Sequence, residues 1–200
     1  MKAVVMAGGL ATRLRPLTTA TNKHMLPVYD RPMIQRNIET IVASGVTDIL
    51  VLLNNTFAQP IMELLEYGEK LGAHIMYGYE RNAVSVGKHI SIAEKFVGDE
   101  SFLLYLGDSF YRWPLDMTMV GDGAFMWVMP LGNDDDFRKY AEVSLDQSTR
   151  PRVVGITERP QEQKTGIVQT GAWVFPSNVF GRTRRLLGSV QGEVQVRTIV

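Results

Sequence analysis

The sequence MKAVVMAGGLATRLRPLTTATNKHMLP, residues 1–27, decides how the rest of the chain is interpreted. An apolar, β-branched run over residues 2–7 ends at Gly8 and Gly9, a pattern typical of a buried strand that turns into a loop. The loop carries two arginines, several threonines and Lys23. Two hypotheses are open at this point. The loop is either a structural turn with surface arginines or a cradle whose backbone N–H groups hold phosphate.

Strand and helix patterns alternate from the first glycines to about residue 108. The predicted helices open at proline and close at glycine, as Pro32 and Gly45 illustrate. This order predicts an α/β fold of the Rossmann-like kind, with a doubly wound, mostly parallel sheet and helices on both faces. The predicted strands are residues 2–7, 48–54, 73–79 and 101–108, and the predicted helices are residues 32–45, 59–72 and 85–98.

The C-terminal part of the sequence has shorter connections between its strand-like segments, which predicts an antiparallel elaboration of the C-terminal third. We expect a single domain over residues 1–200, with halves at residues 1–120 and 121–200. The acidic run at residues 134–136 is interpreted as a solvated helix start rather than a metal cluster. The predicted strands are residues 123–131, 140–146, 151–158 and 171–176, followed by a short helix at residues 178–188.

Composition limits the classes of function. The 200 residues are 45% hydrophobic, with 21 Lys+Arg, 21 Asp+Glu and no cysteine. A balanced charge argues against nucleic acid as the main partner, and the lack of cysteine excludes disulfides and thiolate chemistry. We see no signal peptide and no run of about 18–20 apolar residues that would span a membrane. The sequence therefore predicts a cytoplasmic protein without a membrane partner.

A phosphate cradle needs small residues for close backbone approach and fixed positive charge. Gly8 and Gly9 are the small residues. Thr12 offers a hydroxyl donor, and Arg13 and Lys23 supply the positive charge. The spacing matches neither the Walker P-loop nor G-x-G-x-x-G. Because Gly107 and Asp108 also follow a predicted strand, we expect them to lie close to this loop at the carboxyl edge of the sheet.

Several motifs, in order along the chain, resemble those of the sugar-phosphate nucleotidyltransferases, and most closely the glucose-1-phosphate thymidylyltransferases. MAGGLATRLRPLT and NKHMLPVYDRPMI are similar to that family's signature A-G-G-x-G-T-R-L-x-P-x-T followed by S-K-x-x-L-P-[VI]-Y-D-K-P-M-I. YLGDSFY resembles the segment that carries the family's metal-binding aspartate. KYAEVSLD, GITERP, QTGAWVF and GEVQV resemble later segments, so the likeness covers nearly the whole chain.

The resemblance implies transfer of a nucleoside monophosphate from a nucleoside triphosphate to a phosphorylated small molecule, with release of pyrophosphate. It implies Arg13, Lys23 and Asp108 as catalytic residues, with Asp108 as a ligand of Mg²⁺. Residues 1–120 would bind the nucleotide and residues 121–200 the acceptor. The implied nucleotide-binding residues are Ala7, Gly8, Gly9, Ala11, Thr12, Arg13, Glu80, Gly87 and Gly107, and the implied acceptor-binding residues are Tyr140, Glu158, Arg159, Thr170 and Gly171.

Several positions depart from the family pattern. Ala11 replaces a loop glycine, which costs about 1 kcal/mol if φ is positive there. Arg159 stands where the family has a lysine that binds the sugar phosphate, and Gln191 where it often has an arginine. Thr198 falls where a second metal-binding aspartate is expected, and Glu193 would need a shift in alignment to substitute for it.

The residue expected to read the base is Glu80, where the family has glutamine. An ionised carboxylate only accepts hydrogen bonds, and guanine and cytosine offer amino donors that thymine and uracil lack. Glu80 therefore favours GTP or CTP over dTTP or UTP. The alternative is that Glu80 faces solvent and backbone groups read the base.

Two further alternatives remain open from the sequence. A chain that retains the nucleotide loop but lacks part of the metal and acceptor site would be a nucleotide-binding regulatory module rather than an enzyme. The family pattern also continues past the segment that resembles residues 192–196, so the chain is either a compact member or part of something longer. The resemblance further implies a homo-oligomer.

Overall fold

The computed structural model describes residues 1–200 except residues 10, 55, 81–85, 134 and 190–200. The chain forms two compact units. The first comprises Met1–Phe125 and Val174–Val200, and the second comprises Met126–Trp173. The described residues from Val174 to Ser189 thus belong to the same unit as the N-terminal residues.

The first unit is built on four parallel strands in the order β5-β4-β1-β6. Strand β1 lies between two partners, and its alanine and valine side chains are fully buried. A strand that is covered on both faces has a continuous apolar sequence, which is why the pattern KAVVMA predicted it. The strands are β1 (Lys2–Met6), β4 (Asp48–Asn54), β5 (His74–Glu80) and β6 (Phe102–Leu106).

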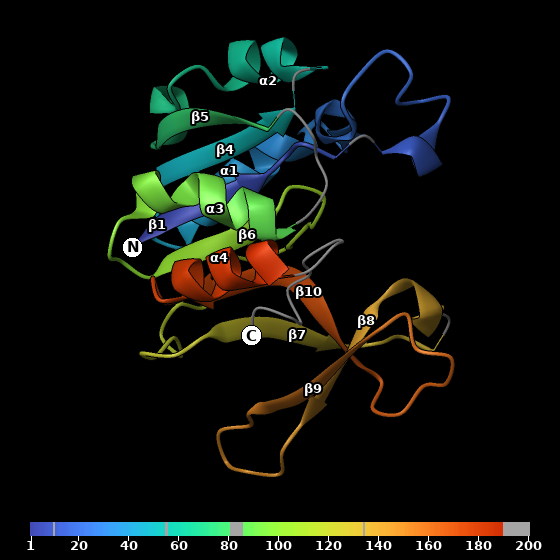
Figure 1. Ribbon diagram of the computed structural model, residues 1–200. Helices are drawn as coiled ribbons and strands as arrows, with labels where there is room; N and C mark the ends of the chain where they lie inside the picture. The colour runs from blue at the N-terminus through green and yellow to red at the C-terminus, as the bar shows by residue number, and fades with distance from the viewer. Residues whose placement is uncertain (10, 55, 81–85, 134, 190–200) are drawn as a thin grey trace. The chain divides into compact units, whose positions relative to one another are not determined.

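Helices cover both faces of this sheet, as predicted (Figure 1). Helices α3 and α4 lie on the face toward the viewer and α1 lies behind the strands. Helix α1 buries Ile34, Ile38 and Ile41 completely, an apolar stripe at helical spacing. The helices are α1 (Met33–Ala43), α2 (Ala58–Leu65), α3 (Val86–Val97) and α4 (Val179–Ser189), and the shorter elements are η1 (Thr12–Leu14), η2 (Lys23–Met25), β2 (Pro27–Val28), β3 (Arg31–Pro32) and η3 (Glu69–Leu71).

The helix predicted over residues 59–72 is wrong in its extent. Helix α2 ends at Leu65, because Glu66 adopts a left-handed φ of 48° and Gly68 one of 87°. A Cβ at Gly68 would lie 2.7 Å from Ile75, so the chain turns tightly against β5 at a glycine. The apolar periodicity of the sequence continues through this turn, whereas the helical conformation of the backbone ends at Leu65.

The return of the chain to the first unit is stabilised by an aromatic cluster. The ring of Phe102 stacks on Phe180 at 5.3 Å between centroids and lies 6.0 Å from that of Phe175. All three side chains are buried. Burying such rings contributes several kcal/mol, on the order of 2 per ring. This cluster explains why α4 packs with the N-terminal unit although it is distant in sequence.

The second unit is antiparallel, as predicted for the C-terminal third. Strand β8 pairs with β9 and with β10 in antiparallel register, and β7 pairs with β10. Strand β10 begins four residues before the predicted start at residue 171. The elements are β7 (Phe125–Pro130), η4 (Phe137–Lys139), β8 (Ala141–Leu145), β9 (Val153–Glu158) and β10 (Ile167–Phe175), so β7 starts and β10 ends in the first unit.

Asp136, the last residue of the acidic run at residues 134–136, lies at a helix start, as interpreted. The Asp136 side chain accepts a hydrogen bond from the backbone N–H of Arg138 and caps η4. Asp134 lies outside the described residues. Across the described ranges of the chain, no helix is both long enough and apolar enough to cross a bilayer.

Candidate functional site

The carboxyl ends of β1 and β6 bring the Gly8–Gly9 loop and the Gly107–Asp108 turn together. The two strands are parallel neighbours, with Met6 paired to Leu106. Across this edge the Lys23 Nζ lies 2.5 Å from the Asp108 Oδ2. The expected proximity of the opening loop to the Gly107–Asp108 turn is confirmed by this contact between two residues that are 85 positions apart in the sequence.

Gly107 is enclosed so closely that only glycine fits. Its N–H donates to the Met6 carbonyl at 3.0 Å. A Cβ at this position would lie 2.7 Å from that carbonyl oxygen and 2.8 Å from the His24 ring. The sequence singled out Gly107 as a nucleotide-binding residue, and the structure adds a packing reason for its identity.

Three buried asparagines hold the backbone carbonyls of the site. The Nδ2 of Asn22 donates to Ala7 O at 3.3 Å, that of Asn54 donates to Gly8 O at 2.5 Å, and that of Asn37 donates to Gly107 O at 2.7 Å. A buried carbonyl without a partner costs about 1–3 kcal/mol, so these amides fix the loops in place. Sequence reasoning missed all three. Asn37 left the clearest signal, a polar residue inside the apolar stripe of a helix.

His24 was assigned no role from the sequence, yet it is almost fully buried beside the site. Asn22 donates to a carbonyl through Nδ2, so its Oδ1 is an acceptor, and it lies 2.6 Å from His24 Nδ1. That nitrogen therefore carries the proton of the neutral ring. Burial and, to a smaller extent, the charge of Lys23 lower the pKa of His24 to about 3, although Asp108 opposes both effects. The imidazole is a neutral packing and hydrogen-bonding group at pH 7.

The Lys23–Asp108 pair supplies the charge of the site. Burial raises the pKa of Asp108, but the charge of Lys23 and its hydrogen bond outweigh burial, so the pKa lies below its ordinary value. The Asp108 side chain is 47% exposed and that of Lys23 is 18% exposed. The site therefore presents an ionised, accessible carboxylate next to a largely enclosed ammonium group.

Ala11 has the positive φ for which the sequence predicted a cost of alanine relative to glycine. Ala11 has a φ of 47°, in the left-handed region that favours glycine. Its carbonyl accepts hydrogen bonds from the Thr18 hydroxyl at 2.9 Å and the Leu14 N–H at 3.0 Å. Thr12 and Arg13 follow in η1, with Arg13 exposed.

Two more expected nucleotide-binding residues lie at the same strand edge or near it. Glu80 is the last residue of β5 and pairs with Asn54 at the end of β4. Gly87 is buried in the first turn of α3, where its carbonyl accepts a hydrogen bond from Ser91. The side chains of Thr12 and Glu80 are outside what the structure describes, as are Gln191, Glu193 and Thr198.

The expected acceptor residues all belong to the second unit. The Arg159 N–H donates to the Tyr140 carbonyl at 3.1 Å, and Glu158 pairs with Ala141, so these residues lie together where β8 begins and β9 ends. Arg159 is exposed and has a φ of 45°. The Thr170 hydroxyl donates to the Trp127 carbonyl at 2.7 Å, and Gly171 follows it in β10.

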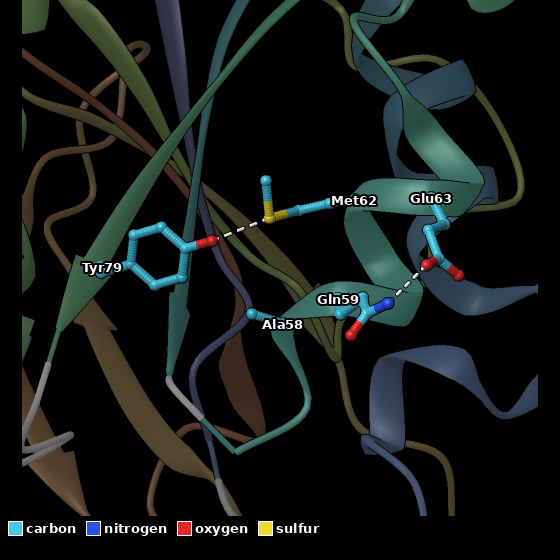
Figure 2. Close-up of a pocket in the computed structure, with 5 residues that line it drawn as sticks. All are labelled: Ala58, Gln59, Met62, Glu63 and Tyr79. Atoms are coloured by element: carbon cyan, nitrogen blue, oxygen red, sulfur yellow. Dashed lines mark hydrogen bonds between the residues drawn. The ribbon is translucent and has the colours of Figure 1, made fainter.

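Within the described residues, no group of three or more His, Asp or Glu side chains could enclose a metal ion. Asp108 is the expected metal ligand whose side chain the structure describes. A separate open pocket of about 580 Å³ lies between α2 and β5 (Figure 2). In it the Tyr79 hydroxyl contacts the Met62 sulfur, and the described residues that line it include none of the expected site residues.

Comparisons with known proteins agree with this architecture. A family model described as nucleotidyl transferase matches residues 2–195. A glucose-1-phosphate thymidylyltransferase from Neisseria meningitidis is 29% identical over 98% of this chain and 68% of its own length. One from Streptomyces antibioticus is 30% identical over 98% of this chain and 55% of its own. A low-salt glycan biosynthesis nucleotidyltransferase from Haloferax volcanii is 29% identical over 98% of this chain and 55% of its own length.

Among solved structures, a putative glucose-1-phosphate thymidylyltransferase from Bacillus anthracis matches 100% of this chain and 80% of its own, with a TM-score of 0.90 and 26% identity. A UDP-glucose pyrophosphorylase shares the fold, with a TM-score of 0.78 and 17% identity over 99% of this chain and 84% of its own. The chain thus spans little more than half to two thirds of the length of the curated relatives it matches. With its family match over nearly all residues, the chain belongs to the nucleotidyl transferase family.

Proposed function

We propose that this chain transfers a nucleoside monophosphate from a nucleoside triphosphate to a sugar 1-phosphate, or to a similar phosphate or phosphonate, and releases pyrophosphate. The observation that carries the proposal is the 2.5 Å Lys23–Asp108 pair beside the Gly8–Gly9 loop. Both reactants are anions. Fixed positive charge and in-line positioning are therefore the main requirements for catalysis.

In the proposed step, an acceptor phosphate oxygen attacks the α-phosphorus. The bond from that phosphorus to the bridging oxygen breaks, and pyrophosphate leaves with the electron pair. Lys23 is proposed to neutralise the α-phosphate, and Arg13, exposed on the loop, the departing pyrophosphate. The backbone from Ala7 to Thr12 is proposed to bind the triphosphate. No protein nucleophile is required.

Asp108 fits the proposed metal. Mg²⁺ binds oxygen ligands and commonly takes one or two carboxylates together with substrate phosphates, so a single ionised, accessible carboxylate is sufficient on the protein side. When bound, the ion would neutralise phosphate charge. Lys23 donates a hydrogen bond to the same carboxylate.

The acceptor is proposed to bind in the second unit, at Tyr140, Glu158, Arg159, Thr170 and Gly171. Arg159 would contact the acceptor phosphate with a planar fork of donors in place of the point charge of a lysine. Relatives named glucose-1-phosphate thymidylyltransferase support a sugar 1-phosphate as the first acceptor to test.

The base preference is proposed from Glu80 alone. An acceptor-only side chain at the end of β5 favours GTP or CTP, whereas the names of the relatives favour dTTP. Replacing Glu80 by glutamine should shift the preference toward dTTP or UTP. An unchanged ratio of kcat/KM values across the four nucleotides would exclude Glu80 as the base-reading residue.

The deciding experiment measures phosphate released by added pyrophosphatase, using each nucleoside triphosphate, Mg²⁺ and a panel of sugar phosphates. We expect turnover with at least one pair, and a loss of about 100-fold or more in kcat for Lys23→Met. Lys70→Met, which removes an exposed lysine paired with Glu66, is the matched control and should retain activity. Tight nucleotide binding without turnover for any pair would instead indicate a nucleotide-binding module.

A further inference from the structure

The turn that presents Asp108 is held by one buried side chain from α1. Asn37 is completely buried, and its Nδ2 donates to the Gly107 carbonyl at 2.7 Å. That carbonyl belongs to the peptide bond that leads directly into Asp108. The hydrogen bond is short and buried, so it restricts the orientation of that peptide plane.

The other groups of Gly107 are fixed as well. Its N–H donates to the Met6 carbonyl at 3.0 Å, and the His24 ring packs against its Cα closely enough to exclude a methyl group. The Ser109 N–H then closes a turn onto the Leu106 carbonyl at 3.0 Å. The Asn37 hydrogen bond can be removed by a side-chain substitution outside the turn's own sequence.

Tyr105 adds a weaker contact from below the turn. Its hydroxyl lies 3.5 Å from Asn37 Oδ1 and 3.4 Å from the Ser109 carbonyl. A hydroxyl has one proton to share between these two acceptors, and both distances are long. Asn37 and Tyr105 therefore contact the backbone on either side of Asp108, with Asn37 making the stronger hydrogen bond.

From these contacts we propose that Asn37 is a positioning residue, which sets the direction of the Asp108 carboxylate by holding the Gly107 carbonyl. The inference rests on the proposed function, since it assigns Asp108 as the ligand of Mg²⁺. Losing the hydrogen bond would leave Lys23 and the Gly8–Gly9 loop in place but free the peptide plane before Asp108. The affinity for the metal should fall more than the affinity for the nucleotide.

The test compares Asn37→Ala with Ser44→Ala. Ser44 ends the same helix, and its Oγ accepts a hydrogen bond from the Leu115 N–H at 2.8 Å, so its removal also breaks a partly buried side-chain to backbone bond. For Asn37→Ala we expect the Mg²⁺ concentration for half-maximal rate to rise about 10-fold, as expected when a partner of a ligating carboxylate is lost. The KM for the nucleotide should change by less than about 3-fold, and saturating Mg²⁺ should restore part of the rate.

A second measurement does not depend on turnover. Hydrogen exchange of the amides of residues 107–109 in the purified chain should be about 10-fold faster in Asn37→Ala than in the unmodified chain or in Ser44→Ala. Unchanged exchange at these amides would overturn the proposal, whether or not the chain turns over. A second result would also overturn the proposal: the unmodified chain turns over, but Asn37→Ala and Ser44→Ala need the same Mg²⁺ concentration for half-maximal rate. That result would leave the proposed function intact. No turnover by the unmodified chain, combined with faster exchange, would reject the proposed function and retain Asn37 as the residue that holds the turn.

Discussion

The first unit holds its loops with neutral amides, whereas the second unit holds one with a buried charge. In the first unit, Asn22, Asn37 and Asn54 donate to backbone carbonyls. In the second unit, Glu142 is 4% exposed and its Oε1 accepts hydrogen bonds from three successive N–H groups at residues 164–166, at 2.7–2.9 Å. Burial raises the pKa of Glu142, but these N–H groups outweigh it and the pKa is lowered.

The difference has an electrostatic consequence. Neutral amides fix the backbone of the first unit without adding charge. An ion pair at that strand edge joins Lys23 and Asp108, two charged residues of the proposed site. The loop of the second unit depends on a carboxylate that stays ionised. The stability of the first unit should therefore fall when a side chain is added at a closely packed glycine, and that of the second unit should fall when one carboxylate is removed.

Gly107→Ala should have the largest effect. The new Cβ would lie 2.7 Å from the Met6 carbonyl, and backbone cannot yield there without separating β1 from β6. We expect the free energy of unfolding to fall by about 3 kcal/mol, measured by urea denaturation. Gly9→Ala is the control, because its Cβ would meet only the flexible end of Lys23 at 3.4 Å. Equal stability of the two variants would show that the first unit is not tightly packed at this turn.

Glu142→Ala tests the second unit in the same assay. It removes the acceptor of three N–H groups, which should lower the free energy of unfolding by about 2–3 kcal/mol. Glu162→Ala removes an exposed carboxylate from the same unit and should change stability by less than about 0.5 kcal/mol. If Glu142→Ala lowers the free energy of unfolding no more than Glu162→Ala does, the buried carboxylate does not hold the loop at residues 164–166.

The pH dependence of stability separates the two units. The pKa of His24 falls from 6.5 to about 3 in the folded chain, so between these values the unfolded chain binds a proton that the folded chain does not. Stability therefore rises with pH in this window, and acidification from pH 7 to pH 5 should cost about 2 kcal/mol through His24. The folded pKa of Glu142 is also lowered, so its contribution is present above the unfolded value of 4.5 and is lost only below it.

His24→Gln should flatten the slope of stability between pH 7 and pH 5, whatever its effect on stability at pH 7. His74→Gln, which replaces a histidine whose side chain is 81% exposed, is the control. A slope that His24→Gln leaves unchanged would mean that the imidazole is not kept neutral by burial.

Ala11→Gly should have the smallest effect and the opposite sign. Ala11 has a φ of 47°, so glycine should raise the free energy of unfolding by up to about 1 kcal/mol. Ala7→Gly is the control at a buried position without a positive φ and should be destabilising. A decrease on Ala11→Gly would show that the methyl group makes a packing contribution larger than its backbone cost.

Most of the fold could be predicted because its strands are continuous apolar runs and its helices have regular stripes. Every parallel strand of the first unit was found in the sequence, and so was the meeting of the Gly8–Gly9 loop with Asp108. The end of α2 was missed, because the left-handed turn at Glu66 leaves no mark on hydrophobic periodicity. The early start of β10 was missed for a similar reason, since its first residues pair with β8 only in three dimensions.

The sequence by itself determined which residues could carry charge to a phosphate and in which order the strands follow one another. It placed the opening loop, which carries Lys23, and the Gly107–Asp108 turn after two strands, and parallel pairing brings the ends of those strands to one edge of the sheet. The tertiary structure alone decided that Asn37 reaches Gly107 and that His24 is buried and neutral. A local pattern reports which face of an element is apolar, whereas the partner of a buried polar group depends on elements that are distant in sequence.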